Sequence, residues 1–423
     1  MANEQKTGGN VAAIATMFAL FFMIAFVTNF AGSMSVVATN QFHASATASQ
    51  LGSAANFFAY LFMGIPGGLI LKRKGYKFTA LLAAAVGFVG LGIQLLSGHV
   101  GEGSAFNVYL AGAFVAGFSM CLLNLVVNPL LNTLGGEGKK GNQLVQMGCS
   151  LNSIGATIAP MLLGFLIGEN ISEANVAKVA PALMIAMGLF ALAFLIVAFS
   201  RIPEPHMEKP EEKAARLAGK TSVVADIFAT LKFRHFTLGA IAIFFYIVIE
   251  SGIPNMANMY MSKNNAVGPV IAGSVVAGYW FCMMIGRIVG GAIGGKISSR
   301  VMLTVCALFG IGLMLAAMYM PEKMIEVAGK NIPMNMCAVV LAGLCTSVMW
   351  GGIFNLAAEG LGKYVPMGSG IFMAMVFGGV LLPAQGALAG KVGFLNSYWM
   401  TIGLFAYVLF YALVGSRVSK RAE

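Results

Sequence analysis

Residues 243–260 read IFFYIVIESGIPNMANMY, and this stretch decides the fold because it places a carboxylate inside a segment apolar enough to cross a bilayer. A charge at the bilayer centre costs about 2.5 to 3.5 kcal/mol on insertion scales, so Glu250 has to face protein or water. Pro254 lacks the main-chain donor that would bond the carbonyl of Glu250, which predicts a bend in the helix. Tyr246 and Asn258, four residues before Glu250 and eight after it, fall broadly on the same face.

A bent membrane helix with a polar face is what a solute site near the bilayer midplane requires. The alternative is a structural carboxylate that is tied to a neighbouring helix. The stretch by itself leaves both interpretations open, and the rest of the chain has to decide between them.

The composition predicts many membrane helices. Of 423 residues, 58% are hydrophobic and only 10% are charged, against about 25% in soluble domains. At about 20 apolar residues per crossing, the length holds roughly a dozen helices. The net charge of +11 comes from basic residues spread thinly through loops, which argues against nucleic-acid binding.

No enzyme, metal or cofactor signature appears in the sequence. The six cysteines lie in apolar runs without metal-ligand spacing, so we expect neither disulfides nor zinc. The four histidines fall in loops or at helix ends, and no nucleotide-binding loop or catalytic triad is present. The chain is therefore not expected to be an enzyme or a nucleotide-driven pump.

The apolar runs predict an all-α membrane protein with twelve transmembrane helices in two pseudo-symmetric six-helix bundles. A polar, proline-containing segment separates them, so the predicted domains are an N-terminal bundle (1–200), a cytoplasmic linker (201–235) and a C-terminal bundle (236–423). Lys and Arg concentrate in alternate loops, which predicts that both termini are cytoplasmic. The predicted helices span 11–39, 47–71, 78–97, 107–133, 143–167, 181–200, 236–261, 269–295, 301–320, 335–358, 368–390 and 397–416.

The two halves repeat each other at a constant offset of 223 residues, as expected for a duplicated unit. The matching positions run from the second to the fifth helix of each half: Gly67-Gly68 with Gly290-Gly291, Lys77 with Arg300, Asn132 with Asn355, Gly155 with Gly378 and Pro160 with Pro383.

Several motifs resemble a known family. The six-plus-six pattern and the basic turn 68–77 resemble the major facilitator superfamily, although Lys72 stands where its signature has an aspartate. Within it, the chain resembles the fucose:proton symporter family, above all the glucose/galactose transporter branch. That narrower resemblance rests on Asn128-Pro129, Leu134-Gly135, Asn152-Ser153-Ile154-Gly155, Glu250, Gly286-Arg287, the run 354–363 and Gly368-Ser369-Gly370.

The resemblance implies a sugar transporter, with departures that bear on its mechanism. Fucose-type symporters carry an aspartate in helix 1 and a glutamate in helix 4, and the matching positions here are Gly32 and Asn124. A glutamine of helix 5 is replaced by Cys149. The first half thus lacks a membrane-embedded acid, which puts coupling by the fucose-type route in doubt.

Binding a sugar requires amides, carboxylates and hydroxyls at helical spacing, with an aromatic plane for the apolar face of the ring. The predicted binding residues are Asn29, Asn124, Asn128, Asn152, Tyr246, Glu250, Asn258, Trp350 and Gln385. For any single asparagine, and for Trp350, packing between helices is an equally plausible role.

Arg287 lies nine residues before Lys296, roughly 13 Å inside the cytoplasmic edge at about 1.5 Å per residue. Because an unpaired guanidinium is implausible there, we predict an ion pair with Glu359 that acts as a cytoplasmic gate.

The expected function is a secondary transporter that imports a hexose or related monosaccharide across the cell inner membrane, as a monomer. Glu250 is the candidate coupling residue, and proton coupling, sodium coupling and uncoupled uniport all remain open. An exporter of amphipathic compounds is the alternative from another solute class, against which the asparagines argue.

Overall fold

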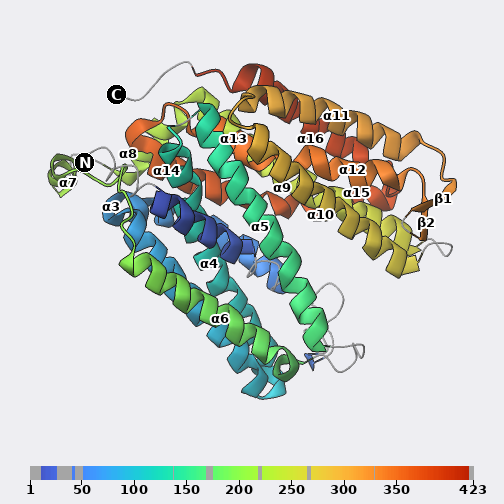
Figure 1. The fold of residues 1–423 in the computed structure, drawn as a ribbon, viewed down its shortest axis with the longest axis horizontal. Helices are drawn as coiled ribbons and strands as arrows, with labels where there is room; N and C mark the ends of the chain where they lie inside the picture. Colours follow the sequence, from blue (N-terminus) through green and yellow to red (C-terminus); the bar gives the residue numbers. More distant parts are fainter. Residues whose placement is uncertain are drawn as a thin grey trace.

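The computed structural model describes residues 11–25, 41–42, 51–136, 138–167, 175–217, 222–263, 268–327 and 329–418, and it is dominated by long apolar helices (Figure 1). Within these ranges, nine helices are long and apolar enough to span a membrane. One of them joins two predicted helices, because α3 continues through a kink at Gly75, whose φ is 84°. The count of twelve and the cytoplasmic location of both termini stay predictions.

Residues 11–25 form the first helix. The elements that follow are α3 (Leu51–Leu96), η2 (Ser97–His99), α4 (Glu102–Leu134), α5 (Gly138–Ile167), α6 (Val176–Phe199), α7 (Pro210–Leu217), α8 (Val223–Leu231), α9 (Arg234–Lys263), α10 (Gly268–Ile293), α11 (Ser299–Tyr319), β1 (Met324–Val327), β2 (Lys330–Pro333), α12 (Met336–Ser347), α13 (Met349–Ala358), η4 (Gly362–Tyr364), α14 (Val365–Ala374), η5 (Met375–Leu381), α15 (Leu382–Val392), α16 (Tyr398–Phe410) and η6 (Tyr411–Gly415).

Several features of this order differ from the predicted helices. The predicted helix 335–358 is divided at Val348 into α12 and α13, and the predicted helix 368–390 is divided by η5 into α14 and α15. A short antiparallel hairpin, in which Met324 pairs with Pro333 and Val327 with Lys330, connects α11 to α12. It lies at one end of the molecule, outside the helices (Figure 1).

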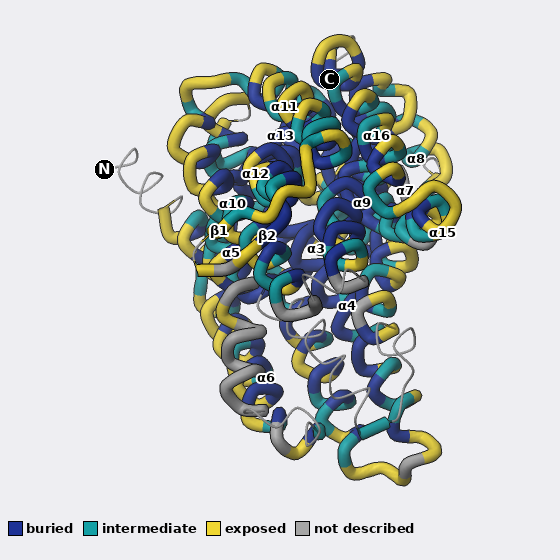
Figure 2. The backbone as a smooth tube through the Cα atoms, turned by 90° about the vertical axis from the view of Figure 1, so that its right-hand side faces the viewer, coloured by how far each residue is buried: buried dark blue, intermediate teal, exposed yellow. Residues whose placement is uncertain are grey.

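Two lobes meet along a seam of small residues. In one lobe α3, α4 and α6 lie side by side, and the other contains α9 to α16, with α5 against α10 between them (Figure 1). Buried residues line the helix faces inside each lobe and between the lobes (Figure 2). On one side of the seam α3 packs against α14, and a Cβ atom added to Gly64 would lie 2.6 Å from the carbonyl oxygen of Gly370. The backbones therefore touch, as small residues in membrane helices allow.

The contacts across the seam follow the offset of the sequence repeat. Gly68 packs against Gly370, and Gly291 packs against Met147; a shift of 223 residues converts the first pair into the second. The amide of Asn355 donates to Asn132 Oδ1 at 2.6 Å, and these two residues are 223 positions apart. Two equivalent residues that bond each other lie close to the axis relating the halves.

The basic residues Lys77 and Arg300, also one repeat apart, have equivalent roles. Lys77 Nζ donates to the carbonyls of Ala198 and Ser200 at the end of α6. Arg300 donates to the hydroxyl and carbonyl oxygens of Ser416, just past η6. A cation at a helix C-terminus satisfies carbonyls that the helix leaves unpaired.

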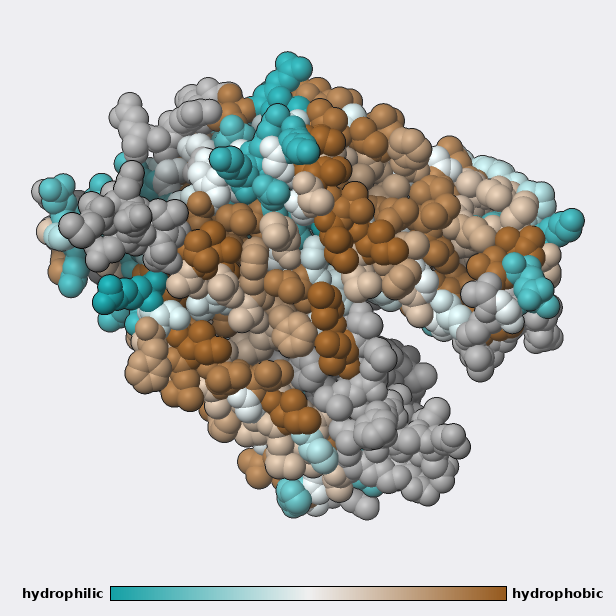
Figure 3. Space-filling view, viewed as in Figure 1, coloured by the Kyte–Doolittle hydropathy of each residue, from teal (hydrophilic) through white to brown (hydrophobic). Residues whose placement is uncertain are grey.

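The linker is docked against the basic turn between the two parts of α3. The Glu204 carboxylate accepts from the main-chain N–H groups of Tyr76 and Lys77, and the Tyr76 hydroxyl lies 2.7 Å from His206 Nδ1. Lys72 forms an ion pair of 2.7 Å with Asp226 of α8. Together with the packing of α3 against α14, these contacts close the molecule at the end that carries the basic turn. Figure 3 shows hydrophobic residues over broad parts of both lobes.

Burial affects both acid–base groups of this docked segment. It lowers the pKa of His206 to about 4, so the ring that is hydrogen-bonded to Tyr76 is neutral at pH 7. Burial also raises the pKa of Glu204, against the lowering effect of its two N–H partners.

The linker should undock in acid. Because the docked His206 has a pKa below its usual value of 6.5, docking is complete above pH 6.5 and weakens as the pH falls toward 4. The raised pKa of Glu204 acts in the opposite direction, because its protonation favours docking, so at pH 5 we expect a net loss of about 1 kcal/mol. Limited proteolysis of the linker between pH 7 and 5 measures it: His206→Asn should remove the loss of docking in acid, and the exposed His99→Asn should keep it. An unchanged pH dependence in His206→Asn would contradict this assignment.

The seam should not tolerate a side chain at Gly370. Gly370→Val places atoms against the main chain of Gly64, so the closed end should open and the melting temperature in detergent should fall. Gly312→Val is the matched control, because a Cβ at Gly312 meets nothing within 4 Å. The melting temperature of the purified protein measures both, and an unchanged value for Gly370→Val would show that the seam is not tightly packed.

Candidate functional site

Pro254 determines how Glu250 is held. The helix α9 runs through this proline, which cannot donate to the carbonyl of Glu250. The Tyr279 hydroxyl of α10 donates to that carbonyl instead, at 3.0 Å, and also lies 2.9 Å from the Thr346 hydroxyl of α12. A buried carbonyl without a partner is costly, so this bond both satisfies the proline break and fixes the backbone at Glu250.

The Glu250 carboxylate lies in an ion pair with Arg287 of α10. Arg287 Nη2 donates to Glu250 Oε1 at 3.1 Å, and the Tyr246 hydroxyl donates to the same oxygen at 2.7 Å. The two charged side chains are only 11% and 16% exposed. The sequence left two interpretations of Glu250 open: a residue of a solute site, or a structural carboxylate tied to a neighbouring helix. The structure shows a carboxylate that faces protein and is paired with a residue of the neighbouring helix α10.

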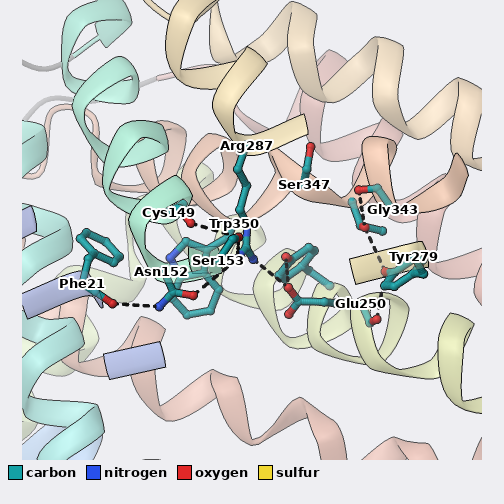
Figure 4. A network of polar contacts seen from close by, with 12 residues as sticks. Phe21, Cys149, Asn152, Ser153, Glu250, Tyr279, Arg287, Gly343, Ser347 and Trp350 are labelled. Carbon is teal, nitrogen blue, oxygen red and sulfur yellow. Dashed lines mark hydrogen bonds and ion pairs between the residues drawn. The ribbon is translucent and has the colours of Figure 1, made fainter. Parts of the chain in front are cut away.

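Arg287 also reaches the other half of the molecule. Its Nη1 donates to the hydroxyl of Ser153 at 2.8 Å and to Asn152 Oδ1 at 3.5 Å, both on α5. Asn152 in turn donates to the carbonyl of Phe21 in the first helix at 3.4 Å. Figure 4 shows Arg287 extended from α10 toward these residues and Glu250. The guanidinium therefore bridges the two lobes.

The predicted Arg287–Glu359 gate is wrong for this structure. Arg287 is paired with Glu250 at 3.1 Å instead. The prediction measured depth along the backbone, but helical side chains point toward the N-terminus of their helix. For α10 that direction leads away from the basic end and toward the level of Glu250.

The asparagines of α4 form a second polar row. Asn124 donates to the Tyr60 hydroxyl at 2.9 Å, and Asn128 donates to Asn124 Oδ1 at 3.1 Å. The indole N–H of Trp350 donates to Asn128 Oδ1 at 3.1 Å, across the seam between the halves. These amides are buried, and their mutual bonding is the least costly arrangement for amides in a membrane helix.

Trp350 connects the asparagine row to the ion pair. Its ring centroid lies 6.3 Å from that of Tyr246, whose hydroxyl bonds Glu250, and 6.1 Å from that of Phe372. An aromatic plane is thus placed between the amides and the carboxylate. Six of the predicted residues form this arrangement: Asn124, Asn128, Asn152, Tyr246, Glu250 and Trp350.

The other three predicted residues are not shown in this group. Gln385 is fully buried, donates to Thr401 on α16 and lies against Gly252, so it packs α15 and α16 onto α9. Asn258 is half-buried, two turns further along α9 than Glu250. Asn29 lies outside the described residues.

Ser153 and Tyr60 are members of the network that the sequence analysis did not predict. Ser153 follows Asn152 in a motif that the sequence analysis quoted. The sequence did not indicate that its hydroxyl lies buried beside the guanidinium of Arg287. A single tyrosine in an apolar helix gives no signal at all. Among the described residues, no cluster of three His, Cys, Asp or Glu side chains lies in a position to hold a metal ion.

The fold and site define a class of protein: a multi-pass membrane protein in two repeated halves, with an enclosed polar site where the halves meet. The chain belongs to the major facilitator superfamily, whose model matches residues 16–256. It also belongs, within that superfamily, to the family of the fucose:proton symporter and the glucose/galactose transporters.

The similar proteins agree over nearly the whole chain. A glucose/galactose transporter of Brucella abortus is 30% identical over 98% of this chain and 96% of its own length. The L-fucose-proton symporter of Escherichia coli is 22% identical over 92% of this chain and 90% of its own. A crystal structure of the Escherichia coli fucose:proton symporter superimposes with a TM-score of 0.82 at 20% identity, over 97% of this chain and 100% of that one, which supports the fold.

Removing Arg287 should destabilise the protein more than neutralising both partners. A buried charge without its counter-ion costs about 3 to 5 kcal/mol, whereas a neutral pair avoids most of that cost. We expect a large fall in melting temperature in detergent for Arg287→Met and a smaller one for the double variant with Glu250→Gln. The exposed Arg201→Met is the control. Equal losses in the single and double variants would contradict a tightly coupled pair.

Proposed function

We propose that this protein is a secondary transporter that imports a monosaccharide by alternating access across the cell inner membrane. The observation that carries the proposal is the enclosed network of amides, hydroxyls, a carboxylate and a guanidinium, contributed by both halves around Trp350. Relatives named glucose/galactose transporters support a hexose as the solute.

The chemistry of the network suits a sugar. Each sugar hydroxyl donates and accepts, and Asn124, Asn128, Glu250 and Arg287 together offer donors and acceptors of both kinds. The Trp350 ring supplies a plane for the C–H face of a pyranose. A sugar that enters replaces the bonds that these side chains now make to one another, so no buried polar group is left without a partner.

The proposed transport cycle uses the contacts between halves as its switch. Several hydrogen bonds cross the seam, among them those of Trp350 with Asn128, Arg287 with Ser153, and Asn355 with Asn132. Asn132 and Asn355 lie nearest the closed end. When the halves rock about the site, these bonds break and the closed end opens, as in alternating access.

We propose Glu250 as the coupling residue. It is the acid in the middle of a membrane helix, and the positions of the fucose-type acids are Gly32 and Asn124 here. A sugar that takes Arg287 or Tyr246 as its partner weakens the contacts of the carboxylate, which then exchanges a proton or holds a sodium ion. A uniporter is the outcome if neither ion is used.

Uptake of labelled monosaccharides into proteoliposomes tests the transport proposal. Asn128→Ala and Trp350→Phe should each reduce uptake at least tenfold, the effect of about 1.4 kcal/mol. Asn396→Ala and Trp399→Phe are matched controls, because both residues lie outside the network and Trp399 is 52% exposed. Normal uptake by the network variants, or failure of the native protein to take up any monosaccharide, would overturn the proposal.

The same preparation tests coupling. With imposed proton or sodium gradients, Glu250→Gln should lose accumulation above equilibrium while equilibrating exchange persists, and the exposed hairpin variant Glu326→Gln should behave as the native protein. If Glu250→Gln still accumulated the sugar with an unchanged ion dependence, Glu250 would not be the coupling group. If deletion of the gene altered drug resistance without altering sugar uptake, the alternative function, export of amphipathic compounds, would be favoured.

A further inference from the structure

The linker helix α8 has two unlike faces. On one face Asp226 pairs with Lys72 at 2.7 Å and Thr230 is fully buried. Val223 and Ile227, on the same face, pack against the hydrophobic core. The polar groups of α8 are therefore turned toward the protein, where α8 also contacts α14 and α9.

The opposite face of α8 is apolar and uncovered. Val224, Phe228 and Leu231 are 59%, 63% and 36% exposed. Their spacing of four and three residues places them in one stripe along the helix. A surface helix in water has the reverse arrangement, with its apolar stripe hidden, so this stripe is suited to an apolar medium.

The position of α8 places that stripe at the membrane boundary. Two residues separate α8 from the membrane helix α9, and the Thr237 hydroxyl of α9 donates to the carbonyl of Leu231 at 2.7 Å. Phe233 packs its ring 5.7 Å from Tyr364, at the start of α14. The last residue of α6, Phe199, is 85% exposed at the same end of the molecule. Helix ends define the level of the headgroups.

Exposed basic residues lie near α8. Lys232 and Arg234 follow α8 directly, and exposed Lys363 lies over the ring of Tyr364, which packs near Phe233. Asp226 is the single aspartate of the chain, and Lys72 neutralises it. Basic residues beside an apolar stripe complement an anionic lipid surface.

We propose that α8 lies in the headgroup boundary of the cytoplasmic leaflet, with Val224, Phe228 and Leu231 in contact with acyl chains. Lys232, Arg234 and Lys363 bind anionic phospholipid headgroups. Because the inner face of α8 holds Lys72 of the first half and contacts α14 of the second, the leaflet acts directly on the closed end of the seam. This lipid contact does not depend on which solute the protein carries.

Environment-sensitive labels test the location of α8. The full chain is prepared with its six cysteines replaced by serine and with Phe228→Cys added, labelled with bimane and reconstituted. Phe309→Cys, on the exposed side of α11, is the lipid reference, and Glu211→Cys, on α7, is the water reference. The label at Phe228 should show blue-shifted emission and be quenched by brominated acyl chains, as at Phe309, and not by aqueous iodide.

The lipid headgroup is tested with vesicles of phosphatidylcholine alone and of phosphatidylcholine with equimolar phosphatidylglycerol. Quenching at Phe228 by brominated chains should increase with phosphatidylglycerol, and Lys232→Gln should reduce that increase, whereas the exposed Lys209→Gln should not. Iodide quenching equal to that at Glu211 in both vesicles would overturn the proposal. Shielding that requires added cytosolic protein would also overturn it, since the stripe would then bind a protein.

Discussion

A charge cannot stand alone in the bilayer, and most of the interior arrangement follows from that constraint. Glu250 and Arg287 satisfy it together, with Tyr246 and Ser153 completing the hydrogen bonds. Since Arg287 comes from one half and Ser153 from the other, the pair is also a contact between halves. In the proposed transport cycle, the same charges that are enclosed in this conformation become available to solute when the halves move apart.

Proline has a related role in α9. Pro254 removes the donor for the Glu250 carbonyl, and Tyr279 supplies the missing hydrogen bond. The backbone at the acid is therefore held by a neighbouring helix rather than by its own. The position of the Glu250 backbone therefore depends on α10 and α12, and the geometry of the site is set by helix packing rather than by the local sequence alone.

The closed end is held by contacts of two kinds. Backbone packing at Gly64, Gly68 and Gly370 is close and non-polar, while the Asn132–Asn355 bond lies near the axis that relates the halves. Both kinds follow from duplication, because equivalent helices meet across that axis. The docked linker adds Lys72–Asp226, and this pair restores an acid beside the basic turn whose signature aspartate is replaced by Lys72.

Sequence reasoning predicted membrane helices, the repeat and most of the polar residues, because burial costs in oil are large and leave few positions for Glu250, Asn124, Asn128 or Asn152. It could not predict partners. The pairing of Arg287 depended on the direction and length of a side chain between two helices, and the backbone depth of Arg287 suggested Glu359 instead. Tyr60 gave no signal and Ser153 only its place in a motif, since a hydroxyl in an apolar helix is inexpensive until a neighbour is known. The sequence by itself determined which groups must be hidden from lipid; only the tertiary structure decided which of them meet, because pair energies depend on distances across helices that no local pattern encodes.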